Sequence, residues 1–338
     1  MILRTEIVEQ TVNGEERVEL VKEIVMTPSQ QLGMVRKRLP PPHESKGTVL
    51  LVHGFAQNRY TWHLEGRSFS AYLAREGYDV FTVDLRGHGR SRRYSDALPR
   101  TVDEYVQEDI PIVVREALRI SGAEKGFLIG HSMGGMISYA AAPALRDQLR
   151  GVVSIGSPFR FGLGNAFLRN LAKILATIRF TGIFDKNPRL PTHLFGRHVL
   201  GGFRSVFDLP AFPASAQGWK PGSMEPELLR EYLGKSFEAT AVQILFDIFS
   251  GADRVTYGAP DGRVDYGIAF ESLDLPLLVI AGTEDSLAPP ASVKEAYRMS
   301  GSRDKTYREF PAGHIDLVHG REAPQTVWPL IRDWLDRH

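Results

Sequence analysis

The chain has 338 residues, of which 43% are hydrophobic and 24% are charged, a globular composition with enough apolar side chains to bury a sizeable core. Lys and Arg together number 41 against 40 Asp and Glu, so the formal net charge of +1 gives no electrostatic reason to expect a nucleic-acid partner or a strongly charged substrate. The chain contains no cysteine, which excludes disulfides, thiolate metal ligands and a cysteine nucleophile.

The N-terminal ten residues carry charges at Arg4, Glu6 and Glu9, which interrupt any apolar stretch. They therefore lack the pattern of a secretory signal. No part of the sequence approaches the roughly 18 consecutive apolar residues that a membrane-spanning helix needs. We expect a cytoplasmic protein without a spanning segment, and the sequence leaves its oligomeric state open.

Two kinds of sequence pattern follow one another along the chain. Residues 17–38 contain short β-prone runs on either side of a Pro28-Ser29 turn, which predicts an antiparallel hairpin. After three consecutive prolines, apolar runs alternate with helical segments, the pattern of a mostly parallel sheet with helices on both faces. We expect strands at 48–53, 79–84, 126–129, 151–155, 276–281 and 306–310, and helices at 69–76, 102–121, 133–146, 290–299 and 323–335.

The alternation stops after Ser157-Pro158 and resumes at about Leu273. The intervening sequence is rich in aromatic residues, Pro and Gly and contains several helical patterns. We therefore expect a core formed by residues 1–157 and 267–338, with an inserted, mainly helical cap at 158–266. Six apolar residues form one stripe along a predicted helix of the cap: Phe167, Leu168, Leu171, Ile174, Leu175 and Ile178. We expect this stripe to pack onto the sheet. The alternative is a lid face that lines an acyl pocket or contacts lipid.

The strongest motif is Gly-His-Ser-Met-Gly-Gly at residues 130–135, directly after an apolar strand and directly before a helical run. It matches G-x-S-x-G in the strand–turn–helix setting that a nucleophilic serine needs. Glycines at Gly130 and Gly134 are expected because larger side chains would strike the neighbouring strand or helix. The motif predicts Ser132 as a nucleophile that is presented on a sharp turn.

A serine hydroxyl needs a base, and histidine suits the task because its usual pKa lies near neutrality. His314 follows the last predicted strand on a Pro/Gly loop, from which its side chain can reach back across the carboxyl edge of the sheet. His319 is the competitor, but it falls at the start of the next element. We predict His314 as the general base.

The base needs a carboxylate that accepts a hydrogen bond from its other ring nitrogen and holds its tautomer. The strand at 276–281 ends in Gly-Thr-Glu-Asp, which puts two acids at the same sheet edge. We favour Asp285, with Glu284 as the alternative and Asp316, close to His314 in sequence, as a weaker one.

An oxyanion hole needs two backbone N–H donors about 3 Å from the developing charge. The N–H of Met133, next after the nucleophile, is the first candidate, and the N–H of Phe55 in the loop after the strand at 48–53 is the second. In the same loop, His53 is expected to brace the backbone rather than to transfer protons. The glycine-rich turn at residues 84–91 is expected to support these loops from below.

Together, His53-Gly54, residues 84–91, 130–135 and 282–285, and Gly313-His314 resemble the α/β-hydrolase family from about Thr48 to the C-terminus, apart from the cap. The resemblance implies an α/β-hydrolase fold, a mostly parallel sheet flanked by helices. Residues 314–324 also resemble acid lipases and polyhydroxyalkanoate synthase-like hydrolases, although the synthases use cysteine where Ser132 stands. Epoxide hydrolases and haloalkane dehalogenases of this fold use aspartate there, which disfavours their chemistry.

These features predict an enzyme that cleaves a small-molecule carboxylic ester with a medium-sized hydrophobic acyl or alcohol group, through an acyl-serine and without a metal or organic cofactor. Acyl transfer, lactone hydrolysis and other serine-triad hydrolysis keep the same residues, so the motif leaves them open. A non-catalytic binding protein of the same fold is a further alternative, because function does not follow from fold alone.

Overall fold

The structure is a computed structural model in which residues 1–160, 162–192, 218–250 and 265–338 are described. Within these ranges, one nine-stranded sheet has the order β1-β2-β3-β5-β4-β6-β7-β10-β11. Its strands are β1 (Ile2–Asn13), β2 (Glu16–Met26), β3 (Gly33–Arg38), β4 (Thr48–Val52), β5 (Asp79–Asp84), β6 (Gly126–His131), β7 (Leu149–Ile155), β10 (Leu277–Gly282) and β11 (Lys305–Phe310). The pairings from β1 through β3 to β5 are antiparallel, and all the others are parallel.

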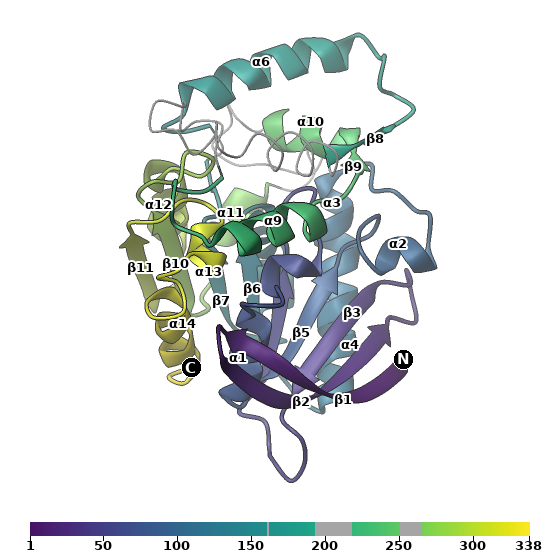
Figure 1. Cartoon of the computed structure of the whole chain (residues 1–338). Coiled ribbons are helices and arrows are strands. Elements are labelled where there is room, and N and C mark those ends of the chain that lie inside the picture. The colour runs from purple at the N-terminus through teal and green to yellow at the C-terminus, as the bar shows by residue number, and fades with distance from the viewer. Residues whose placement is uncertain (161, 193–217, 251–264) are drawn as a thin grey trace.

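Helices cover both faces of the sheet (Figure 1). α1 (Phe69–Arg75) and α14 (Val327–Leu335) pack on the face to which Val49 and Leu51 of β4 point. α4 (Ile110–Ser121), α5 (Met133–Ala141), α11 (Tyr266–Glu271) and α12 (Pro290–Met299) pack on the face of Leu50 and Val52. Because successive strand residues point to opposite faces, a strand covered on both sides is apolar throughout, as β4 is. The predicted mostly parallel sheet with flanking helices is confirmed.

The antiparallel end of the sheet contains a strand that the sequence analysis did not assign. The predicted hairpin is present, with β2 and β3 paired from Val21↔Arg38 to Met26↔Gly33. β1 adds a further antiparallel strand beyond β2. Much of this edge strand is exposed, including Ile7. Its sequence therefore lacks the continuous apolar face by which a strand can be recognised.

Several predicted boundaries shift in the structure. The helix expected over 102–121 is divided into α3 (Val102–Glu104), a π-helical turn (η2, Tyr105–Asp109) and α4. Pro111 lies in the first turn of α4, where its missing N–H leaves no helical hydrogen bond unmade. Shorter elements are η1 (Arg59–Trp62), α2 (Ser91–Tyr94), η3 (Ala142–Leu145) and α13 (Asp316–His319).

The sequence between β7 and α11 is mainly helical where it is described. It contains α6 (Ala166–Phe180), β8 (Arg189–Leu190), α9 (Pro226–Lys235), β9 (Thr240–Ala241) and α10 (Val242–Ser250). α6 packs on α10, and both lie across the upper end of the sheet in Figure 1. Ile174 is 57% exposed, so core packing is wrong for this member of the apolar stripe. The side chains of Phe167 and Leu168 lie outside the description, as do residues 193–217 and 251–264 of the expected cap.

Candidate active site

Ser132 occupies the single residue between β6 and α5. Its backbone has φ 56° and ψ −123°, a conformation that is strained for any residue with a side chain. Its N–H donates to the carbonyl of Ile155 at 3.0 Å, which fastens the turn to β7. The residue is partly exposed, whereas His131 and Met133 on either side of it are buried. The turn therefore presents Ser132 at the carboxyl end of the sheet.

The glycines of this turn are required by close backbone contacts. A Cβ atom at Gly134 would lie 2.3 Å from the carbonyl oxygen of Val52, and one at Gly130 would lie 2.4 Å from the backbone of Gly134. Real Cβ atoms do not approach backbone atoms so closely, so neither position accepts a larger residue without movement of β4 or α5. The steric reason expected from the G-x-S-x-G spacing is present.

His314 and Asp285 form a buried hydrogen-bonded pair. His314 Nδ1 donates to Asp285 Oδ2 at 2.7 Å, and the two residues are 5% and 3% exposed. The other carboxylate oxygen, Oδ1, accepts from the backbone N–H groups of Leu287 at 2.9 Å and Ala288 at 2.8 Å. The carboxylate is thus fixed by the loop after β10 and holds Nδ1 of His314 as the donor. Nε2 remains as the nitrogen that can accept a proton.

The loops that carry Ser132, Asp285 and His314 meet at one edge of the sheet. His131, directly before Ser132, donates from Nε2 to the carbonyl of His314 at 3.1 Å, and the two imidazole rings lie 4.7 Å apart. Gly156, at the end of β7, approaches both partners: its Cβ would lie 3.3 Å from Asp285 Oδ2 and 3.4 Å from His314 Nδ1. The three residues therefore come from the carboxyl ends of β6, β10 and β11 and lie around the end of β7.

The competing residues are engaged elsewhere. His319 is buried and donates from Nε2 to the carbonyl of Thr61 at 2.8 Å, and burial lowers its pKa to about 3. Glu284 pairs with Lys220 at 2.7 Å at the surface. Asp316 accepts hydrogen bonds from the N–H groups of Gly313 and Lys220 and from the hydroxyl of Ser223. Its carboxylate thus fixes the loop that carries His314.

One predicted oxyanion donor directly follows Ser132 in the chain, and the other directly follows a residue that approaches Ser132. Met133 is the first residue of α5, so its N–H has no acceptor within the helix. Phe55 follows Gly54, where an added Cβ would lie 3.1 Å from Cβ of Ser132. The loop after β4 therefore passes directly over the serine turn.

Residues 47–320 match the sequence family described as the alpha/beta hydrolase fold. The chain belongs to this family. The fold class expected from the sequence resemblance is thereby confirmed.

Individual relatives of this α/β hydrolase carry several enzyme names. Mouse lipase member K is 25% identical over 335 residues, which cover 89% of this chain and 81% of the lipase. Epoxide hydrolase B of Mycobacterium tuberculosis is 34% identical over 119 residues, 35% of this chain, and the chain covers only 31% of that relative's length. A soluble variant of monoglyceride lipase from Saccharomyces cerevisiae shares the fold with a TM-score of 0.65 and 19% identity, over 94% of this chain and 95% of the lipase.

Gln57 is a residue of this α/β hydrolase that the sequence analysis did not single out. Its Oε1 accepts from the N–H of Gly54 at 3.1 Å and from the hydroxyl of Thr61 at 3.0 Å, and its Nε2 donates to the hydroxyl of Tyr232 in α9. The side chain therefore fixes the loop beside Ser132. His131 was also missed as the residue that ties the serine turn to His314. Gln57 has no sequence signal beyond its nearness to His53-Gly54, and His131 occupies a variable position of the G-x-S-x-G motif.

His53 braces the same loop. Its Nδ1 donates to the carbonyl of Gly54 at 2.9 Å, and its Nε2 accepts from the N–H of Leu85 at 3.1 Å. Burial, with repulsion from His88 as a smaller cause, lowers the pKa of His53 to about 3. The ring is therefore neutral at neutral pH and joins the loops after β4 and β5.

The turn after β5 is fixed by charged hydrogen bonds. Asp84 accepts from the N–H and Nη1 of Arg59 and from the N–H of Arg90, each at 2.8 Å. Gly89, at φ +48°, leaves room for this carboxylate, because a Cβ there would lie 2.2 Å from it. The turn thus supports the loop of Phe55 through Arg59.

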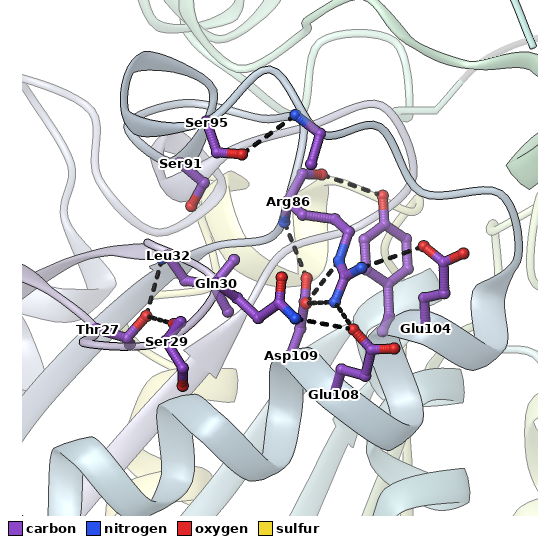
Figure 2. A network of polar contacts seen from close by, with 12 residues as sticks. Thr27, Ser29, Gln30, Leu32, Arg86, Ser91, Ser95, Glu104, Glu108 and Asp109 are labelled. Atoms are coloured by element: carbon purple, nitrogen blue, oxygen red, sulfur yellow. Dashed lines mark hydrogen bonds and ion pairs between the residues drawn. The ribbon is translucent and has the colours of Figure 1, made fainter.

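A second network holds this turn to η2, as Figure 2 shows around Arg86. Asp109 accepts from Nε of Arg86 at 2.8 Å and from its backbone N–H at 2.9 Å. Glu104 and Glu108 bind the two terminal nitrogens of the same guanidinium. Burial raises the pKa of Asp109 to about 6, although Arg86 opposes the shift.

Residues 1–160, 162–192, 218–250 and 265–338 contain neither a metal site nor a membrane-spanning helix. No group of three or more His, Asp or Glu side chains there is arranged to hold a metal ion. Among those same residues, no helix combines the length and the apolar character needed to cross a membrane.

Proposed function

We propose that this α/β hydrolase cleaves carboxylic esters through an acyl-serine intermediate, with Ser132 as nucleophile, His314 as general base and Asp285 as the carboxylate that orients the base. The observation that carries the proposal is the buried 2.7 Å contact between His314 Nδ1 and Asp285 Oδ2, beside the strained turn of Ser132. This contact leaves His314 Nε2 to accept the serine proton.

The proposed reaction has two halves. Oγ of Ser132 attacks the ester carbonyl while His314 Nε2 takes its proton, and the same proton then passes to the alkoxide, which leaves as an alcohol. Water next attacks the acyl-serine while His314 takes its proton, and His314 then returns that proton to Oγ of Ser132 as the acid departs. Backbone N–H groups of Phe55 and Met133 hold the negative oxygen in both halves, and losing one such donor typically adds about 3 kcal/mol to the barrier.

The expected cap, residues 158–266, is proposed to cover this edge of the sheet. Its support is a set of contacts with the loops of the site. Ile315 donates its N–H to the carbonyl of Gly218 at 2.7 Å, and Asn165 donates to the carbonyl of Ser286, next to Asp285. The apolar composition of the segment and the lipases among the relatives favour a small substrate with a hydrophobic acyl or alcohol group.

Epoxide hydrolysis is the competing reaction, because one stretch of 119 residues is similar to an epoxide hydrolase. That reaction needs a carboxylate nucleophile, which epoxide hydrolases of this fold place where Ser132 stands here. Ester cleavage is therefore favoured. Acyl transfer and lactone hydrolysis use the same serine, and product analysis with an added alcohol or thiol acceptor distinguishes transfer from hydrolysis.

The test is turnover of nitrophenyl esters of increasing acyl length by the wild-type protein and by Ser132→Ala. The wild type should hydrolyse at least one ester, and the variant should lose about 10³-fold or more of kcat at an unchanged melting temperature. Full turnover by the variant would refute Ser132 as the nucleophile. If a folded wild type cleaves no ester or lactone but opens an epoxide, the reaction class is wrong.

A further inference from the structure

A small, strongly basic cavity lies away from Ser132, between η1 and the antiparallel end of the sheet. Its volume is about 80 Å³. Lys22 of β2, Lys37 of β3 and Thr82 of β5 line it from one face of the sheet, the face covered by α1. The remaining lining residues are Val35, Arg59, Tyr60, His63 and Arg90. None of the lining residues is acidic.

The base of the cavity is a buried chain of polar groups. Lys37 is 2% exposed, and its Nζ donates to the hydroxyl of Ser70 at 2.9 Å. The Ser70 hydroxyl is 3.2 Å from that of Ser68, which lies 2.9 Å from Nδ1 of His63. The chain satisfies one of the three donors of the lysine with a neutral oxygen and supplies no negative charge.

The nearby carboxylates are already engaged by other cations of the cavity. Glu6 pairs with Lys22 at 2.9 Å, and Asp84 pairs with Arg59 at 2.8 Å. In the described part of the chain, Lys37 and Arg90 form no ion pair, and the Nε atom of Arg90 is buried without a hydrogen-bond partner. Two cationic side chains in one cavity thus have unused donors.

We propose that this cavity binds a small free oxyanion of the size and charge of inorganic phosphate, held by Lys37 and Arg90 with Lys22 and Arg59 at its rim. The volume sets the size of the ligand, because a cavity of about 80 Å³ has room for only a few water molecules or one small ion. It accommodates one tetrahedral anion and excludes a nucleoside or a lipid chain.

Electrostatics gives the reason for an anion rather than a neutral ligand. Burial, and then repulsion from Lys22 and Arg59, lowers the pKa of Lys37 well below its usual range. A buried ammonium without an opposite charge is unfavourable, and an anion in the cavity removes that penalty. An arginine Nε without an acceptor is likewise satisfied by an oxyanion, which accepts several charge-assisted hydrogen bonds at once.

The proposal is tested by titrating the full-length protein with sodium phosphate in a calorimeter, at constant ionic strength set with chloride. Phosphate should bind at one site per chain and raise the melting temperature. Lys37→Met and Arg90→Gln should each weaken binding by about tenfold or more, while Arg93→Gln removes an exposed charge three residues from Arg90 and should leave binding unchanged. Lys37→Met replaces a buried ammonium with an apolar side chain of similar length, which favours a folded variant.

Absence of saturable heat with millimolar phosphate, or equal affinity in wild type, Lys37→Met and Arg90→Gln, would overturn the proposal. A second arm separates free phosphate from a lipid headgroup. The protein should not sediment with phosphatidylcholine vesicles that contain phosphatidic acid. If it does, and if Arg90→Gln abolishes the sedimentation, the ligand is a lipid headgroup and not a free anion. Because binding is measured directly, failure here leaves the proposal for Ser132 untouched, and failure of that proposal leaves this one untouched.

Discussion

At the scale of single residues, two adjacent acids have different environments. Asp285 is buried and accepts hydrogen bonds from His314, Leu287 and Ala288. Glu284 points to the surface, where its side chain is 44% exposed and pairs with Lys220. An exposed pair of this kind contributes little free energy, whereas the buried carboxylate sets the tautomer of the imidazole.

Replacing Asp285 by Asn should lower kcat for ester hydrolysis by about 10³- to 10⁴-fold, because the amide no longer holds Nδ1 of His314 as the donor. The neighbouring variant Glu284→Gln should retain a kcat within about twofold of wild type, because this exposed pair is weak. Steady-state kinetics with one nitrophenyl ester measures both. Equal losses in the two variants would remove Asp285 from its proposed role.

The sequence predicted which strand ends carry polar residues but not where each carboxylate points. Asp316 is two residues from His314 in the chain, yet its oxygens accept from Gly313, Lys220 and Ser223. Such orientations depend on partners distant in sequence, among them Lys220 from the inserted segment. Gln57 was missed for the same reason, since Tyr232, one of its partners, lies on α9.

At the scale of elements, the turn between β6 and α5 packs tightly against the end of β4. Gly134→Ala should lower the free energy of unfolding by about 3 kcal/mol or more, because its Cβ would lie 2.3 Å from the carbonyl oxygen of Val52. Chemical denaturation measures the loss. The control is Gly234→Ala in α9, where nothing lies within 4 Å of the added Cβ. Alanine should stabilise that helix by up to about 1 kcal/mol, and a similar loss in both variants would contradict the steric account.

The Arg86 network, which joins the turn after β5 to η2, gives a second prediction, for the stability of the protein. Arg86→Met should lower the free energy of unfolding by about 3 kcal/mol, because it leaves the buried carboxylate of Asp109 without its cation. Protonation of Asp109 limits the loss, since its pKa already lies at about 6. Urea denaturation at neutral pH measures the effect. Arg17→Met removes a pair with Glu9 that is exposed on both sides and should change stability by at most about 0.5 kcal/mol, and a loss as large as that of Arg86→Met would refute the special role of burial.

Strands could be predicted from the sequence where burial requires a recognisable pattern of apolar residues. β4, β5, β6, β7 and β10 all lie within two residues of their predicted bounds, because both faces of these strands are covered and their sequences are largely apolar. β11 also lies within two residues of its predicted bounds, although it is a partly exposed edge strand. β1 was missed because its exposed edge position leaves it without such a run. The π turn before α4 was missed because the helical period continues through Tyr105–Asp109 and only the hydrogen bonding changes.

At the scale of the whole molecule, several histidine rings are buried with the two hydrophobic cores, one of which lies on each face of the sheet. His53 and His319 are both fully buried, and burial lowers the pKa of each to about 3. In the unfolded chain a histidine titrates near 6.5. Below that pH the unfolded state binds protons that the folded state does not, so acidification favours unfolding.

His319 should therefore contribute about 2–3 kcal/mol to the loss of stability between pH 7 and pH 4.5, a range between its folded and unfolded pKa values. Between pH 7 and pH 4.5, the free energy of unfolding of His319→Gln should therefore fall by about 2–3 kcal/mol less than that of the wild type. Urea denaturation at both pH values measures the difference. The comparison variant is His43→Gln at an exposed position. Identical pH dependence in His319→Gln and wild type would show that His319 is not held neutral in the folded state.

The most direct measurement of the central claim is covalent trapping of the nucleophile with diisopropyl fluorophosphate. A P–O bond should form to Oγ of Ser132 with release of fluoride. Intact mass spectrometry should then show one adduct per chain, peptide mapping should place it on Ser132, and Ser132→Ala should remain unlabelled. Adduct on another residue, or equal labelling of Ser132→Ala, would contradict the assignment of the nucleophile and with it the proposed reaction.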